Sequence, residues 1–298
     1  MDGVLLLDKP TGPTSHDVVA RLRNVTGERS VGHTGTLDPL ATGLLLIVFG
    51  SATRLSAHLT GGDKTYDAVV RLGFATDTDD ALGQPLGSPA SELPDDAAIA
   101  AAVDRFRGTF NQLPPSHSAK KVGGKKAYDM ARADAPLTLA SVPVTVNTLT
   151  YHGHEGDRVR LTVSASAGFY VRALARDLGE ALGCGAHLAE LRRTHSGTFD
   201  VAQATPLADA ERLGKDLAGR LLSPAEALTD LPAVTVTDLG LRRALHGNPL
   251  GPQHLANHWV PPGTAAAGPQ VRVLDESGRL IALAHSRGGA LHPAVVLG

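Results

Sequence analysis

The stretch from Gly32 to Gly43, followed by the apolar run Leu44 to Phe49, is the feature that most constrains this chain. Three glycines and an Asp-Pro step within twelve residues favour irregular backbone, because glycine adopts positive φ and lets another molecule approach closely. The apolar run is short enough to be a buried strand. We therefore expect a loop on the end of a rigid core strand, which is the support that a positioned functional group needs.

One carboxylate lies in the middle of this loop. Asp38 is the only acidic residue between Glu28 and Asp63, so we expect no second carboxylate beside it to share a proton. An Asp-Pro step is usually just a turn, but His33 and Thr34 precede it on the same loop and the strand follows directly. We interpret Asp38 as a candidate catalytic residue.

Length and composition describe an ordinary globular protein. A chain of 298 residues suggests about two domains, and 42% hydrophobic residues suffice for a sizeable core. The sequence has no apolar run long enough to cross a membrane, and Gly3 to Leu7 is too short for a signal peptide, so we expect a cytoplasmic protein. The single cysteine, Cys184, excludes an internal disulfide and any multi-cysteine metal site.

The distribution of charge favours nucleic acid, whereas the net charge does not. The chain carries −2 at pH 7 with a pI near 6.7, which alone argues mildly against such a partner. From Asp77 to Asp104 there are seven acids and no Lys or Arg. From Arg105 to Arg132, here called the basic block, seven bases stand against the single acid Asp129. Such a block either binds phosphates or forms a solvated charged surface.

Local patterns around the loop predict strands and short helices. Val4 to Leu7 predicts a strand. Ser15 is placed to cap the following helix and Gly27 to end it. The apolar residues of that helix share one face: Val18, Val19, Leu22 and Val25. Ala52 to Leu59 then predicts a short helix, and Tyr66 to Leu72 alternates as a strand.

The middle of the chain contains the basic block and a further strand and helix. Ala97 to Phe106 predicts a helix that leads into the block, and Val159 to Val163 alternates as a strand. Within the block, a polar segment bracketed by Pro-Pro and Gly-Gly is expected to form a finger that its partner orders. From Tyr170 to Leu182 the apolar residues have helical spacing, which places Arg172 in the first turn and Arg176 on the same face.

The C-terminal part predicts a small, mostly β module. Short apolar runs there are separated by Pro and Gly. These runs are Val234 to Val236, Val271 to Leu274, Leu280 to Ala284 and Val295 to Leu297. His254 and His258 have i,i+4 spacing, but no third ligand follows at a metal-binding spacing, so we expect no metal site.

Several of these segments resemble one known family. The string GHTGTLDPLATGLL, from Gly32 to Leu45, resembles the catalytic motif of the TruB family of bacterial tRNA pseudouridine-55 synthases. The resemblance covers most of the chain. Its further segments are Gly3 to Gly12 (GVLLLDKPTG), Lys64 to Gly73 (KTYDAVVRLG), Pro114 to Arg132 (PPSHSAKKVGGKKAYDMAR), Gly168 to Gly179 (GFYVRALARDLG) and Gly183 to Arg193 (GCGAHLAELRR).

The resemblance implies an α+β fold with two domains. A pseudouridine synthase catalytic domain, with a mixed, mostly antiparallel sheet flanked by helices, would span residues 1–230 and include the basic finger at about 108–137. A small β-rich, PUA-like RNA-binding domain would span residues 231–298. The implied reaction flips uridine 55 out of the tRNA T-loop and isomerises it to pseudouridine by aspartate-dependent cleavage and re-formation of the glycosidic bond.

The same resemblance implies what the protein needs and binds. Nothing is oxidised or consumed in this isomerisation, so we expect no cofactor. The expected partner is the T-arm of tRNA, with no guide RNA and no membrane. We expect the protein to act as a monomer.

The resemblance also implies roles for single residues. Asp38 matches the essential aspartate, which acts as nucleophile at the base or sugar, or as the base that starts elimination. Arg172 matches the arginine that pairs with this carboxylate, and Tyr66 matches the tyrosine that stacks on the target uracil. His33 matches the histidine that fills the space left by flipped bases.

A second set of residues would support the site or bind RNA. Lys9 and Leu191 match positions that support the floor of the site, although core packing is the better description of Leu191. The basic finger would contribute His117, Lys120, Lys121, Lys125 and Lys126. Relatives commonly have tyrosine where this chain has His117, which can still stack or donate to phosphate but offers no phenol.

Two other functions are compatible with these residues. One is a guide-dependent pseudouridine synthase of the dyskerin type, which shares the aspartate loop and the PUA domain. The Pro-Leu-Ala-Thr-Gly ending of the loop and the intact basic finger resemble the stand-alone form instead. The other is a non-catalytic tRNA-binding or tRNA-folding protein, which the presence of Asp38, Tyr66 and Arg172 disfavours.

Overall fold

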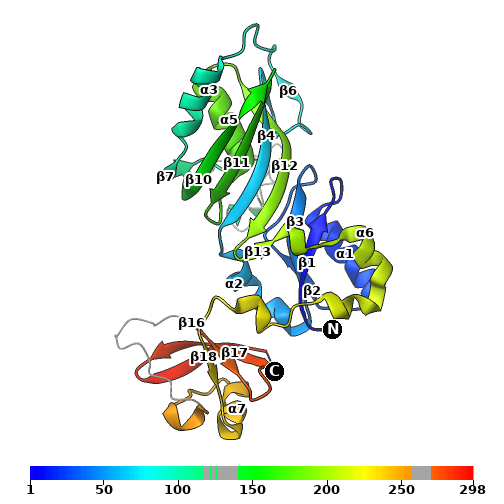
Figure 1. Ribbon diagram of the computed structural model, residues 1–298, viewed down its shortest axis with the longest axis vertical. Helices are drawn as coiled ribbons and strands as arrows, with labels where there is room; N and C mark the ends of the chain where they lie inside the picture. Colours follow the sequence, from blue (N-terminus) through cyan, green and yellow to red (C-terminus); the bar gives the residue numbers. More distant parts are fainter. Residues whose placement is uncertain (117–120, 123–124, 127–139, 257–269, 298) are drawn as a thin grey trace.

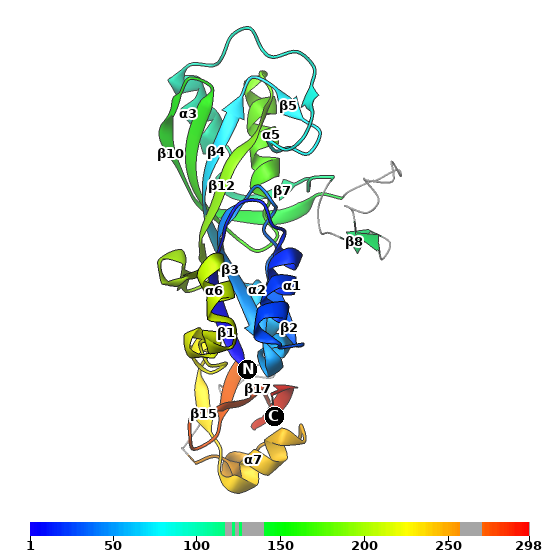
Figure 2. The ribbon, with the colours of Figure 1, turned by 90° about the vertical axis from the view of Figure 1, so that its right-hand side faces the viewer.

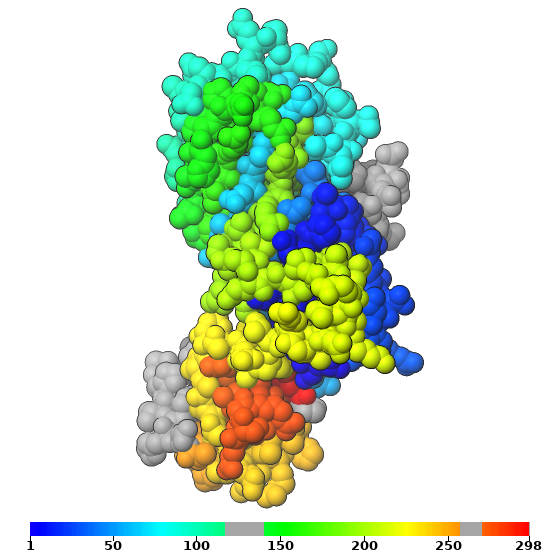
Figure 3. Space-filling model, turned by 45° about the vertical axis from the view of Figure 1, so that its right-hand side comes forward, coloured from blue at the N-terminus to red at the C-terminus, as the bar shows by residue number. Residues whose placement is uncertain are grey.

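A computed structural model gives the fold of the chain. It describes all residues except 117–120, 123–124, 127–139, 257–269 and 298. The molecule is elongated, with an upper and a middle part built on one large sheet and a smaller C-terminal part below them (Figure 1). In the space-filling view the C-terminal part lies against the middle part, next to the N-terminal segment (Figure 3).

The large sheet has 10 strands and is mixed but mostly antiparallel, as expected. Its main path runs β14-β1-β3-β12-β4-β11-β10-β7, with β2 paired to β3 and β13 paired to β12. The strands are β1 (Gly3–Lys9), β2 (Val31–Thr34), β3 (Thr42–Phe49), β4 (Lys64–Leu72), β7 (Gly108–Gln112), β10 (Val142–Glu155), β11 (Arg158–Ala165), β12 (Ala186–Ser196), β13 (Phe199–Asp200) and β14 (Thr205–Pro206). Only β1–β14 and β3–β12 pair in parallel within it.

The two halves of this sheet meet at one narrow junction. Between β3 and β12 the register joins only Arg192 to Thr42 and Arg193 to Gly43. On one side of the junction lie the N-terminal strands, and on the other side the long strands β4, β10 and β11. Since Gly43 ends the loop singled out in the sequence, that loop lies where the two halves join.

The beginning of that loop differs from the expectation. Val31 to Thr34 forms β2, which pairs antiparallel with β3 from Val31 opposite Phe49 to Thr34 opposite Leu46. The irregular segment therefore begins only at Gly35, which has a positive φ of 77°. The apolar run that follows is a fully buried strand, as predicted.

Helices cover the sheet in both halves. They are α1 (Ser15–Thr26), α2 (Ser56–Thr60), α3 (Asp96–Asp104), α5 (Val171–Leu182), α6 (Leu207–Leu213) and α7 (Asp238–Leu245). The 3-10 turns are η1 (Gly50–Leu55), η2 (Val201–Gln203), η3 (Gly214–Arg220), η4 (Glu226–Leu228) and η5 (Pro252–His254). In the middle part α1 packs on β2, and in the upper part α5 packs on β12 and β4 with α3 beside it (Figure 2).

The start of α1 corrects one prediction. Thr14, not Ser15, caps this helix: its hydroxyl accepts from the Asp17 N–H, and the Asp17 carboxylate accepts in return from the Thr14 N–H at 2.8 Å. Gly27 ends the helix in the left-handed conformation, as predicted. Ser15 is instead fully buried, and its hydroxyl contacts the backbone of the loop at Leu37.

The C-terminal part is a second sheet of 4 strands with α7 against it. Its strands are β15 (Ala233–Thr235), β16 (Gln270–Leu274), β17 (Leu280–Arg287) and β18 (Ala290–Val296). It has its own apolar cluster, and Leu280, Leu283 and Leu297 also join a cluster with β1 and β3.

Two further strand pairs lie outside both sheets: β5 (Ala75–Thr76) with β6 (Pro85–Leu86), and β8 (Lys121–Val122) with β9 (Lys125–Lys126). Within the described residues, every helix is too short or too polar to span a bilayer.

Candidate active site

The loop that carries Asp38 is fixed on both sides of the carboxylate. The buried Ser15 hydroxyl donates to the Leu37 carbonyl (3.1 Å) and accepts from the Leu37 N–H (2.9 Å). On the other side, the Gly12 N–H donates to the Pro39 carbonyl at 2.9 Å. Asp38 therefore projects from backbone whose two neighbours are held by other elements, as a positioned group requires.

Arg172 binds the Asp38 carboxylate with two nitrogens. Its Nε lies 2.9 Å from Oδ2, and its Nη2 lies 3.4 Å from Oδ1. The arginine side chain is only 6% exposed, whereas that of Asp38 is 37% exposed. The pair is thus open on the carboxylate side, and the planar guanidinium fixes the direction in which the carboxylate faces. Arg172 lies in the first turn of α5, as the sequence predicted.

A second carboxylate, from outside the loop, reaches the same arginine. Asp80 Oδ2 lies 3.8 Å from Arg172 Nε, and its side chain is almost fully buried. Asp80 Oδ1 accepts from the Thr78 hydroxyl (2.7 Å) and the Leu82 N–H (3.0 Å). The acid comes from a turn distant in sequence, so the loop alone gave no sign of it. The Arg172 guanidinium thus lies between two carboxylates, with Asp38 the closer one.

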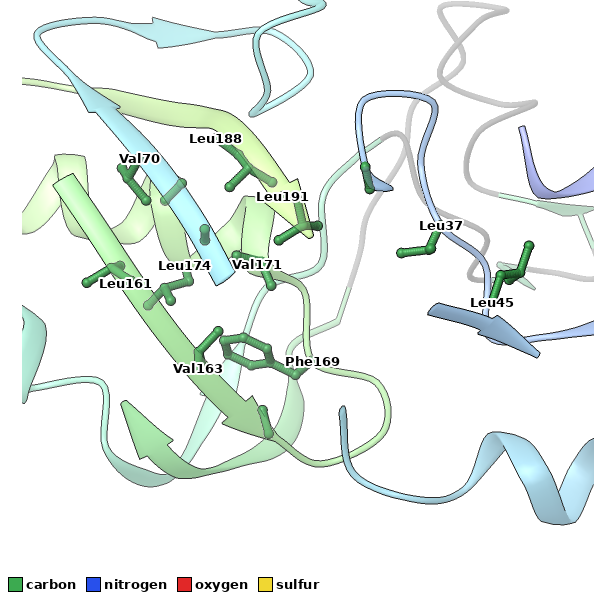
Figure 4. Close-up of a cluster of buried hydrophobic side chains, with 14 of the residues drawn as sticks. Leu37, Leu45, Val70, Leu161, Val163, Phe169, Val171, Leu174, Leu188 and Leu191 are labelled. Carbon is green, nitrogen blue, oxygen red and sulfur yellow. The ribbon is translucent and has the colours of Figure 1, made fainter. Parts of the chain in front are cut away.

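A cavity of about 230 Å³ opens in front of the pair. Its wall includes Asp38, Arg172, Tyr66 and Leu191, so four of the sequence-predicted residues meet here. Leu37 lies on one side, while Leu191, Val171 and Phe169 lie on the other (Figure 4). The cavity is smaller than the ~300–1,000 Å³ of typical drug-sized ligand sites, which suits a single planar base.

Alternating side chains of two strands, β4 and β12, form part of the cavity wall. Side chains two residues apart on a strand share a face. On β4, Lys64 and Tyr66 line the cavity, and the same face continues as buried core at Ala68. On β12, Leu191 and Arg193 line it, whereas Arg192 points to the other face and pairs there with Asp8, with Nη2 2.8 Å from Oδ2.

Three buried, positively charged side chains lie around the cavity and the loop: Arg193, Lys64 and Lys9. Arg193 donates from Nε to the Leu44 carbonyl (2.6 Å) and from Nη2 to the Gly35 carbonyl (3.0 Å), so it ties the loop to β3 and β12. Lys64 donates to the Thr60 carbonyl and, at 2.6 Å, to the Gly62 carbonyl. Lys9 is fully buried and donates to the Pro10 carbonyl at 2.9 Å.

Burial disfavours the charge on both lysines. It lowers the pKa of Lys9 to about 8; Asp38 opposes this shift and Arg193 adds to it. Burial likewise lowers the pKa of Lys64 to about 8, with Arg193 acting in the same direction and Asp63 against it. Asp38 is thus close enough to affect the pKa of Lys9, but Lys9 does not line the cavity.

The remaining predicted residues lie elsewhere. His33, on β2, makes an edge-to-face contact with His16 of α1 at a ring distance of 5.2 Å and is not part of the cavity wall. The backbones of Lys121, Lys125 and Lys126 belong to β8 and β9. In Figure 2, β8 lies beyond β7, away from the large sheet. His117, Lys120 and His258 lie outside the described residues.

Sequence reasoning missed Lys64, Arg193 and Asp80. Alternation could have found the first two, because Lys64 precedes Tyr66 by two positions and Arg193 follows Leu191 by two. Asp80 belongs to an acidic run that looks the same as a solvated turn, so no local signal singles it out.

Comparison with known proteins gives this site a family. Residues 23–171 match the TruB family pseudouridylate synthase (N terminal domain), and residues 172–229 match the tRNA pseudouridylate synthase B C-terminal domain. The tRNA pseudouridine synthase B of Thermobifida fusca is 41% identical, with 99% of this chain and 98% of the relative aligned. That of Dechloromonas aromatica is 42% identical, with 98% and 94% aligned.

Solved structures share the fold over nearly the whole chain. A Cbf5–Nop10–Gar1 complex matches with a TM-score of 0.75 and 27% identity, covering 99% of this chain and 85% of that chain. An H/ACA RNP bound to a substrate RNA containing 2′-deoxyuridine matches with a TM-score of 0.73 and 25% identity, with 99% and 85% covered. The expected α+β fold, with its mixed sheet and small β-rich C-terminal part, is confirmed. The chain belongs to the TruB family of pseudouridylate synthases.

Proposed function

We propose that this protein converts uridine 55 in the T-loop of tRNA to pseudouridine. The observation that carries the proposal is the Asp38 carboxylate, held by Arg172 at 2.9 Å and half open to a base-sized cavity with Tyr66 in its wall. The relatives at 41–42% identity are tRNA pseudouridine synthases, and they align over almost their whole length.

The reaction sets clear tasks for these groups. The bond between ribose C1′ and uracil N1 breaks, the base turns, C1′ bonds to C5, and the proton on C5 leaves while N1 gains one. Asp38 acts at the base or sugar as nucleophile, or as the base that starts elimination. Arg172 orients the carboxylate and favours its ionised form. Tyr66 stacks on the uracil, and Leu191 packs at the floor.

Access to the cavity requires that the target base leave the T-loop. Extrusion costs a few kcal/mol, which stacking and phosphate contacts offset. We assign phosphate contacts to the finger residues His117, Lys120, Lys121, Lys125 and Lys126. His33 fills the space that the flipped bases leave, and Lys9 supports the floor.

The domain division is part of the same proposal. Residues 1–230 form the catalytic domain, and residues 231–298 form a PUA-like domain that adds to RNA binding. The enzyme works in the cytoplasm as a monomer and needs neither guide RNA nor cofactor.

The two other functions predict different behaviour. The Cbf5–Nop10–Gar1 and H/ACA RNP structures align at 25–27% identity, well below the 41–42% of the tRNA pseudouridine synthases B. A guide-dependent enzyme would be inactive on tRNA unless guide RNA were added. A non-catalytic binding protein would bind tRNA without changing uridine 55.

One experiment separates these possibilities. Purified protein is incubated with an unmodified tRNA transcript without guide RNA, and pseudouridine at position 55 is mapped. We expect complete conversion by the wild type. Asp38→Asn, which removes the ionisable group at nearly constant shape, should lower turnover more than a hundredfold, with tRNA affinity within a few fold. Absence of wild-type conversion, or conversion at another uridine, contradicts the proposal.

A further inference from the structure

Two arginines on α5 hold the same distant turn. Arg172 Nη1 donates to the Thr78 carbonyl at 3.0 Å, and Arg176 Nη1 lies 3.1 Å from Asp79 Oδ2. Residues four apart lie on one helix face, so both guanidinium groups reach residues 77–80 together. The position of the Arg172 guanidinium therefore depends on this turn. Arg176 holds the turn through the Asp79 side chain, and Leu188 of β12 holds its backbone through hydrogen bonds to Asp79 and Ala81.

Asp79 is an unusual residue in this turn. Among the described residues it is the only non-glycine with positive φ, at 61°. Its side chain is 14% exposed, and that of Arg176 is 18% exposed. Burial raises the pKa of the Asp79 carboxyl, and Arg176 is the strongest influence in the opposite direction. The buried Asp79 carboxyl stays ionised only while Arg176 pairs with it. The pair also fixes the positive-φ backbone of Asp79, a conformation that few non-glycine residues adopt.

Arg176 also reaches a third segment. Its Nη2 donates to the carbonyl of Leu113 at 2.9 Å, just beyond the end of β7. The neighbouring residue, Gln112, is buried, and its amide accepts from the Tyr170 N–H (2.9 Å) and donates to the Tyr170 carbonyl (3.1 Å). The chain at the end of β7 is thus bound to Arg176 of α5 and to Tyr170, the residue before α5, and these two points lie on either side of Arg172 in the sequence.

We propose that Arg176, paired with Asp79, is a positioning residue for the reaction. It fixes the turn whose Thr78 carbonyl holds the Arg172 guanidinium against Asp38, and it ties this turn to the end of β7. The inference rests on the proposed function, because the position of Arg172 matters only if Asp38 does the chemistry. Arg176 itself does not line the cavity, so it acts through Arg172.

The test compares two arginine variants alone and together. Single-turnover rates at saturating tRNA and tRNA dissociation constants are measured for Arg176→Met, Arg172→Lys and the double variant. Arg176→Met should lower the rate about tenfold and leave the dissociation constant within about twofold. In the Arg172→Lys background the same change should cost less than about twofold, since the guanidinium that it positions is already absent. Arg176→Lys should recover part of the rate, because an ammonium can pair with Asp79 but lacks the planar fork that also reaches Leu113.

A matched control removes an arginine that is not linked to this turn. Arg158 pairs with Glu190 on the exposed face of the sheet, with its side chain 43% exposed, and Arg158→Met should keep the wild-type rate. Arg176 also pairs with Asp177, with its Nη2 2.8 Å from Oδ1. If Arg176→Met fails to fold, Arg176→Met/Asp79→Asn/Asp177→Asn replaces it, because that variant leaves neither of the two carboxylates without its cation.

Several results would overturn the inference. They are a wild-type rate for Arg176→Met, a loss confined to tRNA affinity, losses that multiply fully in the double variant, or failure of both Arg176 variants to fold. Each of these leaves wild-type conversion of uridine 55 intact. An inactive wild type would instead refute the proposed function, so the two failures are distinguishable.

Discussion

Gly43 and Arg193 approach so closely that no side chain fits between them. A Cβ on Gly43 would lie 2.3 Å from the Arg193 carbonyl oxygen and 2.8 Å from its nitrogen, and Gly43 has a φ of 99°. This contact is the parallel pairing that joins the two halves of the sheet. The same glycine ends the loop that carries Asp38, so the junction and the site depend on one backbone approach.

Gly43→Ala should therefore destabilise the protein and abolish turnover. Both clashing atoms are backbone, so relief requires β3 and β12 to separate, and we expect a loss above about 2 kcal/mol in denaturant unfolding. Gly87→Ala is the matched control: Gly87 also has positive φ, at 76°, but nothing lies within 4 Å of its added Cβ. The control should lose only about 1 kcal/mol and stay active. Equal effects of the two substitutions would assign the result to φ alone.

Ser15→Ala should reduce turnover by loosening the loop. The substitution removes both hydrogen bonds to the Leu37 backbone and leaves buried polar groups unpaired, at about 1–3 kcal/mol. We expect an approximately tenfold lower single-turnover rate. Thr14→Ala removes the cap of the same helix, about 1 kcal/mol, without touching Leu37, and should keep the rate. Comparable rates for the two variants would show that the Ser15 contact does not position Asp38.

Periodicity predicted the elements on which the site stands, but not how they meet. The strand at Tyr66 to Leu72 and the helix from Tyr170 each bury one regular face, and the strand at Val4 to Leu7 is a short apolar run that is buried at every position. A single sequence reveals both kinds of pattern. β12 was not recognised, because it is a central strand that nevertheless contains two adjacent arginines. Burying Arg193 is possible only because carbonyls of distant residues accept its donors, and such partners have no local signature.

The resemblance to the TruB family predicted that Asp38 pairs with Arg172, and the structure shows this pair and the residues around it. Helical spacing places Arg172 and Arg176 on one face, which the structure confirms, but it does not indicate what that face contacts. The turn at residues 77–80 belongs to an acidic stretch and looked solvated. Its Thr78, Asp79 and Asp80 are nevertheless withdrawn from solvent, because side chains of α5 and the backbone of β12 contact them, and these are tertiary contacts.

Tyr66 variants distinguish stacking from proton transfer. Tyr66→Phe keeps the aromatic face in the cavity wall and Tyr66→Ala does not. If stacking is the whole role, Tyr66→Phe should retain most turnover. Tyr66→Ala should lose about 1–3 kcal/mol of stabilisation, which lowers turnover roughly five- to 150-fold. Single-turnover rates at saturating tRNA give the comparison. Equal inactivity of both variants would assign a chemical role to the hydroxyl.

The finger lysines should affect binding more than chemistry. Each phosphate contact contributes about −0.7 to −0.9 to the slope of log K against log salt. Changing Lys120, Lys121, Lys125 and Lys126 to Ala should weaken tRNA binding and flatten this slope by up to ~3 units, with a much smaller effect on saturated turnover. Affinities measured from about 50 to 200 mM salt provide the slope. An unchanged slope would direct the search for the RNA path to the arginines of the C-terminal part.

Lys64 should make stability depend on alkaline pH. Its folded-state pKa, about 8, lies below the ordinary value of 10.5, so between these values the unfolded chain binds more protons than the folded one. Lys64 therefore adds stability as pH rises through this window, by at most about 1.4 kcal/mol per pH unit, and its burial penalty is complete below pH 8. Lys64→Met removes this slope, so the stability of the wild type relative to the variant should increase from pH 8 to 10.5. Urea unfolding across this range, with the exposed Lys215→Met as the control for loss of one charge, provides the measurement. Parallel pH profiles for the wild type and Lys64→Met would mean that the buried ammonium does not titrate there.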